Sequence, residues 1–282
     1  MFTLTQTYPK KRAFITGAGS GLGAALCHHL ARDGWTIGMA EMREEPLQEQ
    51  CAKVAALGGK PIPILLDVTD RARYAKVVED FLAEQGGVDL VVNNAGVAGS
   101  GDVGEYSLED WDWLMSINFT GVLHGCHFFA GPLKRQRSGH IINIASAAAL
   151  APVPKLSAYC CAKVGVKMLT ECMYNEMHAF GVRMTVVMPE FFQTKLYERT
   201  RGQDQAQTRR ILERSKYTAE DVARVVLTQA GEGRLHVAYP LSTLIMNYVR
   251  RFFPMTFIHL VRKESLKREA VAAAEVAKQA RT

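Results

Sequence analysis

The sequence predicts an α/β fold in which one doubly wound parallel sheet forms a single domain and a helical C-terminal extension follows. Strand and helix signals alternate along the first 190 residues, and each helical segment is long enough to connect two parallel strands. The strand segments are continuously apolar, which is typical of a sheet covered by helices on both faces. Right-handed crossovers should then leave the sheet open, with helices on each side.

Each element follows from its local pattern. Short apolar runs near turn-forming residues predict strands at residues 12–16, 36–40, 62–66, 90–92, 140–145, 183–188 and 234–239. Apolar residues at helical spacing predict helices at residues 24–32, 46–57, 72–84, 108–129, 157–180 and 220–230. No internal repeat or low-complexity linker interrupts this order, so a single domain is expected over residues 1–240.

Residues 241–282 are predicted to form an amphipathic, basic extension. Apolar residues recur at helical spacing from Leu241 to Phe252, and Pro254 should kink or break that helix. Residues 250–268 hold six arginines or lysines and one glutamate, within a chain whose formal net charge is +6. Such a segment suits packing on the protein's own body or on a second subunit, and it equally suits peripheral contact with an anionic membrane surface. It lacks the interleaved aromatic residues of a known nucleic-acid module, so no nucleic-acid partner is expected.

Cysteine usage and the N-terminal segment favour a cytoplasmic protein. The six cysteines form no C-x-x-C pair and no cysteine/histidine cluster with zinc spacing, so reduced thiols and no metal site are expected. The first 14 residues lack the apolar core of a secretory signal. No run reaches the roughly 18 apolar residues of a membrane span. Surface association with a membrane remains open.

A glycine-rich turn lies between the first strand and the first helix, where a Rossmann-type fold binds the phosphates of a nucleotide. Glycines let the backbone approach a pyrophosphate, and the helix N-terminus offers free N–H groups. The residues concerned are Gly17, Gly19, Ser20, Gly21, Leu22 and Gly23. Glu41 ends the second strand, where a carboxylate accepts hydrogen bonds from ribose hydroxyls and repels a 2′-phosphate. This favours NAD over NADP, although Arg43 could reach a 2′-phosphate.

Several short motifs follow one another in a fixed order, each beside a predicted strand or helix. They are T-G-x-x-x-G-x-G at residues 16–23, Asp67-Val68, Asn93-Asn94-Ala95-Gly96, Asn118, Ser146, and Y-x-x-x-K at Tyr159 and Lys163. Together they resemble the short-chain dehydrogenase/reductase family over residues 11–240. The resemblance implies a nicotinamide-dependent oxidoreductase that acts on a secondary alcohol or ketone. It also implies a homodimer or homotetramer that assembles through the helices containing Asn118 and Tyr159.

The motif residues suit proton transfer during ketone reduction. Tyrosine has a pKa of about 10, and Lys163, one helical turn from Tyr159, is expected to lower it. Tyr159 would then act as the general acid and base. The resemblance implies that Ser146 binds the substrate oxygen, that Asn118 anchors a water, and that Lys163 also binds the nicotinamide ribose.

The resemblance also implies which residues contact the cofactor beyond the glycine turn. These are Glu41, Asp67, Val68, Asn94, Ala95, Gly96, Tyr159, Lys163, Pro189 and Thr194. The last two belong to a P-G-x-x-x-T pattern in which Glu190 replaces the glycine. Either the backbone there does not need glycine's freedom, or the turn differs from that of the family.

The segments expected to surround the substrate are small or apolar. They are residues 97–100, 147–154 and 191–192, and they hold no paired arginines for a carboxylate or phosphate. This predicts a lipophilic alcohol or ketone of long-chain, terpenoid, retinoid or steroid-like type. The polar segment within residues 191–216 is predicted to cover the substrate as a lid.

Two other functions fit the same motifs. One is an epimerase or dehydratase of the same fold that keeps its cofactor bound, which the intact Ser146, Tyr159 and Lys163 do not exclude. The other is a non-catalytic, cofactor-binding regulator. Loss of Tyr159 or of the glycine turn would indicate such a protein, and this sequence keeps both.

Overall fold

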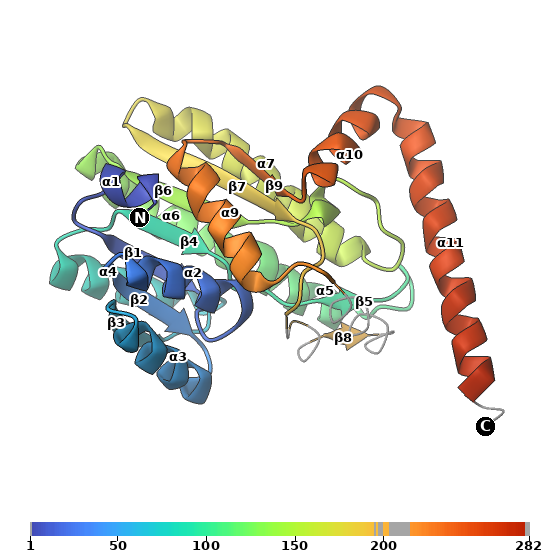
Figure 1. Cartoon of the computed structure of the whole chain (residues 1–282), viewed down its shortest axis with the longest axis horizontal. Coiled ribbons are helices and arrows are strands. Elements are labelled where there is room, and N and C mark those ends of the chain that lie inside the picture. Colours follow the sequence, from blue (N-terminus) through green and yellow to red (C-terminus); the bar gives the residue numbers. More distant parts are fainter. Residues whose placement is uncertain (1, 195, 197–199, 203–214, 280–282) are drawn as a thin grey trace.

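A computed structural model of the chain describes residues 2–194, 196, 200–202 and 215–279. Seven parallel strands form one sheet in the order β3-β2-β1-β4-β6-β7-β9 (Figure 1). Their bounds are β1 Arg12–Thr16, β2 Thr36–Glu41, β3 Lys60–Leu65, β4 Leu90–Asn93, β6 Gly139–Ile144, β7 Val182–Pro189 and β9 His236–Tyr239. The predicted doubly wound α/β fold is therefore confirmed.

Helices cover both faces of this sheet (Figure 1). Their bounds are α1 Thr3–Thr7, α2 Gly21–Arg32, α3 Glu44–Ala56, α4 Arg71–Gln85, α5 Leu108–Met115, α6 Gly121–Gln136, α7 Ser157–His178, α9 Ala219–Gly231, α10 Leu241–Phe252 and α11 Pro254–Gln279. Shorter elements are β5 Gly99–Ser100, which pairs with β8 Arg201–Gly202, a π-helical turn at Ser116–Thr120 and a 3-10 turn at Ala147–Ala149. In the described part of the chain, no helix combines the length and the apolarity needed to cross a bilayer.

Alternate residues of each central strand enter two separate cores. In β1, Ala13 and Ile15 pack with α2, α3 and α9, whereas Phe14 packs with α4, α6 and α7. Val91 and Val92 of β4 divide in the same way. Side chains alternate between the two faces of a strand, so burial on both faces requires an unbroken apolar run. This explains the continuous apolar pattern of the strand segments.

The predicted helix over 108–129 is three elements in the structure. α5 leads into the π-helical turn at Ser116–Thr120, and α6 then continues to Gln136. A π turn adds one residue to a helical turn and leaves the apolar spacing almost unchanged, so the pattern did not reveal it. α6 also continues beyond Phe129, where the predicted helix ended, and past Pro132 to Gln136. Leu133, fully buried just after it, packs in the core beside β4 and β6 and explains why the helix continues.

The C-terminal extension consists of two helices that meet at Pro254. α10 ends at Phe252 and α11 begins at Pro254, as expected for a residue that cannot continue a helix. α11 runs to one side of the sheet layers (Figure 1). The short α1, β5 and β8 and the full length of α11 were not predicted.

A buried ion pair ties the start of β1 to the start of β4. The guanidinium of Arg12 donates to both carboxylate oxygens of Asp89 at 3.0 Å, and to the carbonyl oxygens of Gln85 and Gly86. Asp89 also accepts from the Arg12 backbone N–H at 2.9 Å. Both side chains are over nine-tenths buried. The ion pair thus joins the N-terminal ends of β1 and β4, the two neighbouring strands at which the strand order changes direction.

We expect Asp89→Asn to lower the free energy of unfolding by about 3 kcal/mol, because it leaves the Arg12 charge buried without a counter-ion. Asp80→Asn is the matched control, since Asp80 pairs with Lys76 on the exposed face of α4 and should change stability little. Chemical denaturation of both variants measures the difference. Equal stability of the two variants would contradict this account.

Candidate functional site

One large cavity lies at the carboxyl ends of the strands, where the strand order changes direction between β1 and β4. Its volume is about 1480 Å³. Strands, helices and the loops after the strands all contribute to its lining, and nearly all the predicted site residues line it. These are Gly17, Gly19, Ser20, Gly21, Leu22, Glu41, Asp67, Val68, Asn94, Ala95, Gly96, Asn118, Ser146, Tyr159, Lys163, Pro189 and Thr194.

Gly23 is the predicted site residue that does not line the cavity. A Cβ atom built at Gly23 would lie 2.1 Å from the carbonyl oxygen of Gly17. Its place in the motif therefore reflects close packing of α2 against the preceding turn. The cavity-facing part of the turn is residues 17–22, directly before and at the N-terminus of α2.

Thr16 and Asn94 join the glycine turn to the loop after β4. The Thr16 hydroxyl accepts from the backbone N–H groups of Asn94 and Ala95, at 3.0 and 3.1 Å. The Asn94 side chain donates to the carbonyl oxygens of Thr16 and Gly17, at 3.0 and 3.3 Å. These bonds hold the two strand ends in a fixed relation at the base of the cavity.

Glu41 lies at one end of the cavity, beside the glycine turn. Its side chain is 5% exposed, and a Cβ atom at Gly19 would lie 2.8 Å from its carboxylate. The Glu41 carboxylate accepts from the backbone N–H of Arg43 at 3.2 Å and from the Arg43 guanidinium at 3.0 Å. The guanidinium that could meet a 2′-phosphate is therefore paired with Glu41.

Asp67 and Val68 form the adjoining wall after β3. The Asp67 carboxylate accepts from the backbone N–H and the hydroxyl of Thr69, at 2.9 and 2.8 Å. The Val68 carbonyl oxygen accepts from Nδ1 of the buried His124 at 2.9 Å, which requires the Nδ1–H tautomer. The turn is thus held by its own side chains and by α6.

Asn118 lies in the π-helical turn and is fully buried. Its side-chain oxygen accepts from the Val97 N–H and its amide donates to the Val97 carbonyl, both at 2.9 Å. A Cβ atom at Gly96 would lie 2.8 Å from the Asn118 oxygen, so the loop passes very close. The side chain therefore positions the loop after β4. π turns within α-helices often occur at functional sites for such reasons.

Ser146, Tyr159 and Lys163 meet at the other end of the cavity. Ser146 follows β6 and accepts from the backbone N–H of Ala148 at 3.1 Å. Tyr159 and Lys163 lie one turn apart on α7, with the Lys163 Nζ 5.6 Å from the centroid of the Tyr159 ring. Lys163 is 3% exposed and donates to the carbonyl oxygen of Ile144 at 3.0 Å. β6 and α7 thus place all three side chains together.

Burial controls the acidity of this group. It raises the pKa of Tyr159 to about 12, and a hydrogen bond with Ser146 acts in the opposite direction. It lowers the pKa of Lys163 to about 8. Desolvation disfavours each charged form, the phenolate and the ammonium alike. The sequence led us to expect that Lys163 lowers the pKa of Tyr159, but in this structure desolvation is the largest influence and the pKa of Tyr159 lies above its ordinary value.

The segment after β7 accommodates Glu190 without strain. The described non-glycine residues with positive φ are Lys11, Arg137 and Lys155, so the backbone at position 190 does not need glycine's freedom. The Glu190 N–H donates to the carbonyl oxygen of Tyr239 at 2.8 Å. A Cβ atom at Gly21 would lie 3.0 Å from the Thr194 hydroxyl, so this segment reaches back to the glycine turn.

The predicted substrate walls lie in the same cavity. Lining residues include 97–100, 147, 148, 151, 153, 154, 191 and 192. Of the predicted lid, residues 195, 197–199 and 203–214 lie outside the described residues.

Sequence reasoning missed the contribution of the C-terminal helices to this cavity. α10 provides Ile245, Met246 and Val249, and α11 provides Phe257, Leu260, Val261, Glu264 and Ser265. Helical spacing in residues 241–252 indicated an apolar face, but spacing does not tell which surface that face meets. Only the path of the chain brings it beside the loop after β6, where Arg250 donates to the Ala149 carbonyl oxygen at 3.3 Å.

Comparison with known proteins agrees with this geometry. The family model described as "short chain dehydrogenase" matches residues 11–205. The "Probable oxidoreductase EphD" of Mycobacterium tuberculosis is 37% identical over 187 residues, which are 66% of this chain and 32% of that protein. The chain thus matches about one third of the length of that relative. A cyclopentanol dehydrogenase from a Comamonas species is 31% identical over 186 residues, 66% of this chain and 74% of that protein.

A solved structure shows the same architecture. The short-chain dehydrogenase/reductase from Burkholderia phymatum in complex with NAD has a TM-score of 0.81 and 30% identity, and the match covers 86% of this chain and 92% of that one. The fold, the cavity at the strand ends and the family match lead to one conclusion. The chain belongs to the short-chain dehydrogenase/reductase family of oxidoreductases.

Proposed function

We propose that the chain interconverts a lipophilic secondary alcohol and its ketone with a nicotinamide cofactor, and that Tyr159 transfers the proton. The observation that carries this proposal is the shared cavity. It joins the glycine turn at one end to Ser146, Tyr159 and Lys163 at the other. An acid–base group and a phosphate cradle in one cavity suit a reaction between a cofactor and a carbonyl compound.

The residues present fit a dinucleotide. The cavity runs from Glu41, past the N-terminus of α2, to Lys163. Residues 17–22 would hold the pyrophosphate, and Asp67 and Val68 would flank the adenine. The nicotinamide half of the cofactor would lie beside residues 94–96, Pro189 and Thr194. When bound, the nicotinamide ring supplies or accepts the hydride.

The chain's own residues would handle the proton. With a pKa of about 12, Tyr159 is protonated at neutral pH and can donate to the substrate oxygen during reduction. The Ser146 hydroxyl would hydrogen-bond the same oxygen and stabilise charge that develops on it. Lys163 donates one of its three N–H bonds to Ile144, so two remain for a ribose hydroxyl and for the phenolate that Tyr159 becomes.

Glu41 supports a preference for NAD. A buried carboxylate beside the glycine turn can accept from ribose hydroxyls, and it would repel a 2′-phosphate. Arg43 is bonded to this carboxylate, which reduces the attraction it could offer to that phosphate.

The cavity walls support a lipophilic substrate. Small and apolar residues from the loops after β4 and β6, together with those of α10 and α11, form the part beyond Tyr159. The related Comamonas enzyme is named for an alicyclic alcohol. We therefore propose a long-chain, terpenoid, retinoid or steroid-like alcohol, or the corresponding ketone, as the substrate.

The outer faces of α6 and α7 support a homo-oligomer. Leu123, Val164 and Met168 are exposed there, between 38% and 56%. Such side chains on two neighbouring helices would be covered in a homodimer or homotetramer built on these helices.

We expect Tyr159→Phe to lower kcat/KM by about 10²- to 10⁴-fold, since it removes the proton donor and keeps the ring. NADH binding, followed by fluorescence, should change little. Tyr174→Phe, at a half-exposed position on the same helix, is the control and should retain activity. Full activity of Tyr159→Phe would refute the proposed role. Epimerisation or dehydration of the substrate without net NADH turnover would point to the alternative enzyme class.

The pH profile of ketone reduction should fall above about pH 8. The Lys163 cation is present below its pKa of about 8 and is lost above it, while Tyr159 stays protonated to about pH 12. Deprotonation of Lys163 removes the positive charge that would stabilise the phenolate developing on Tyr159. In Lys163→Arg, which stays charged, the decline should move to higher pH even if the maximal rate is lower. A decline that remains at pH 8 in this variant would exclude Lys163 as its cause.

Glu41→Ala should shift cofactor use toward NADP. Loss of a charge-assisted hydrogen bond to the ribose should weaken NAD binding by about 10- to 100-fold. Removal of the carboxylate also leaves Arg43 available to bind a 2′-phosphate. The ratio of kcat/KM values for the two cofactors is the measurement. Glu45→Ala, exposed at the start of α3, is the control and should leave the ratio unchanged. An unchanged ratio in Glu41→Ala would contradict the assignment.

A further inference from the structure

The helical hairpin formed by α10 and α11 exposes an unusual amount of apolar surface. Of the 17 large apolar side chains exposed in the described part of the chain, eight fall within residues 245–266. These eight side chains are each 41–67% exposed, and they are Ile245, Tyr248, Phe252, Phe253, Met255, Ile258, Leu260 and Leu266. We call this set the hairpin surface. Exposed apolar area of this density marks a contact with something other than water.

Basic side chains accompany the hairpin surface. Residues 250–268 hold six arginines or lysines and one glutamate, so they account for most of the chain's formal net charge of +6. Arg251, Arg262, Lys263 and Lys267 are exposed. Exposed apolar and basic groups on one pair of helices are the combination that binds an anionic lipid interface.

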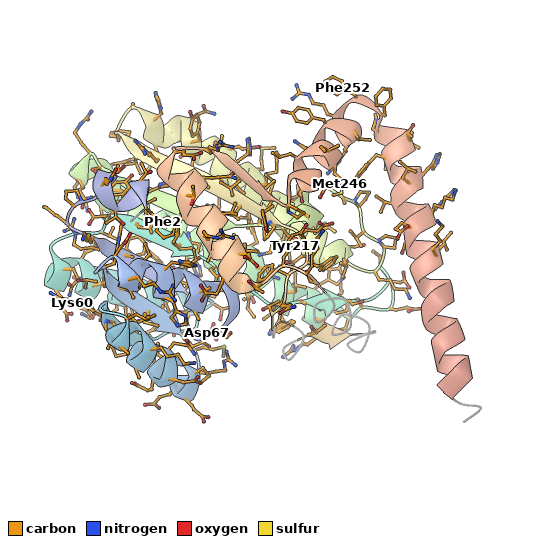
Figure 2. The ribbon with its side chains drawn as sticks, in the orientation of Figure 1. Phe2, Lys60, Asp67, Tyr217, Met246 and Phe252 are labelled. Carbon is orange, nitrogen blue, oxygen red and sulfur yellow. The ribbon has the colours of Figure 1, made fainter. Side chains whose placement is uncertain are left out.

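The hairpin has a second apolar face that belongs to the cavity. Met246 and Val249 of α10 and Phe257 and Val261 of α11 line the cavity that holds Tyr159. Figure 2 shows Met246 on the part of α10 nearer the sheet and Phe252 at the outer end of α10, by the turn into α11. Ile245 and Leu260 belong to both faces, since they line the cavity and are also exposed. The hairpin therefore connects the cavity to its own outer surface.

We propose that the hairpin surface docks on an anionic lipid bilayer and that lipophilic substrate passes from the bilayer, between α10 and α11, into the cavity. The docking is inferred from the exposed side chains of the hairpin alone, whereas the passage of substrate rests on the function proposed above. Phe252, Phe253 and Met255 at the turn would enter the acyl boundary, and the basic side chains would meet the headgroups. The helices would lie on the interface without crossing it.

Charge favours a lipid surface over a second copy of the chain. Two hairpin surfaces facing each other would bring two strongly basic segments together, and like charges in apposition disfavour association. An anionic bilayer offers both the apolar layer and the opposite charge.

Co-sedimentation of the full-length protein with vesicles tests the docking. Phosphatidylcholine vesicles containing phosphatidylglycerol should pellet the protein, and pure phosphatidylcholine vesicles should pellet much less. Arg251→Glu with Lys263→Glu should weaken partition by about tenfold or more, given the usual contribution of each basic residue near an anionic surface. Salt at about 1 M, where the Debye length is about 3 Å, should weaken wild-type partition in the same direction.

Phe252→Ser with Phe253→Ser tests the apolar part. Neither residue lines the cavity. This variant should also lose about tenfold or more in partition, because both rings leave water on binding. Matched controls lie elsewhere on the surface: Val103→Ser with Leu108→Ser for the exposed apolar residues, and Arg71→Glu with Arg73→Glu for the charges. Both controls should pellet like the wild type.

Activity measurements test the passage of substrate. Phe252→Ser with Phe253→Ser should lower kcat/KM for a lipophilic alcohol carried in anionic vesicles and leave kcat/KM for a short, water-soluble alcohol unchanged. If the chain oxidises no alcohol, the proposed function fails, but the sedimentation result still decides the docking.

Three outcomes would overturn the proposal. Wild-type protein could fail to pellet with anionic vesicles, or both hairpin variants could pellet like the controls. Alternatively, light scattering could show that Phe252→Ser with Phe253→Ser dissociates an oligomer while vesicle partition stays unchanged. That last result would assign the hairpin surface to a second copy of the chain.

Discussion

The hydrogen bonds between Thr16 and Asn94 are the constraint on which the site depends. They join the carboxyl ends of β1 and β4, where the helices change from one face of the sheet to the other. A crevice must open at that point, because no crossover helix fills it. Fixing these two strand ends fixes the glycine turn on one side and the loop to Asn118 on the other. The rest of the cavity is built outward from this join.

Burial then determines the chemistry of the cavity. Lys163 is anchored on Ile144 in a desolvated position, and Tyr159 lies beside it on the same helix. Removing both groups from water moves their pKa values in opposite directions, down to about 8 for Lys163 and up to about 12 for Tyr159. Such a pair would hold its proton on the phenol at neutral pH, the state that the proposed transfer to a carbonyl oxygen requires.

The C-terminal helices extend this arrangement beyond the sheet. The family match ends at residue 205, yet α10 and α11 contribute side chains to the same cavity. Arg250 bonds the carbonyl oxygen of Ala149 in the loop that follows Ser146. The extension is therefore coupled to the part of the cavity beside Ser146, while its other face remains in solvent. Substrate choice and surface contact would thus reside in one structural unit.

The sequence alone was enough to predict the α/β class, the order of the elements and the motif residues, because these depend on local patterns: apolar runs, helical spacing and glycine turns. Local patterns could not reveal the π turn at Asn118, since one added residue barely alters apolar spacing. They did not reveal the rise in the pKa of Tyr159, because desolvation depends on the packing of distant segments. They also left open what the apolar face of α10 meets. Only the tertiary structure brings that face to the cavity, because the contact joins residues about 100 positions apart in the chain.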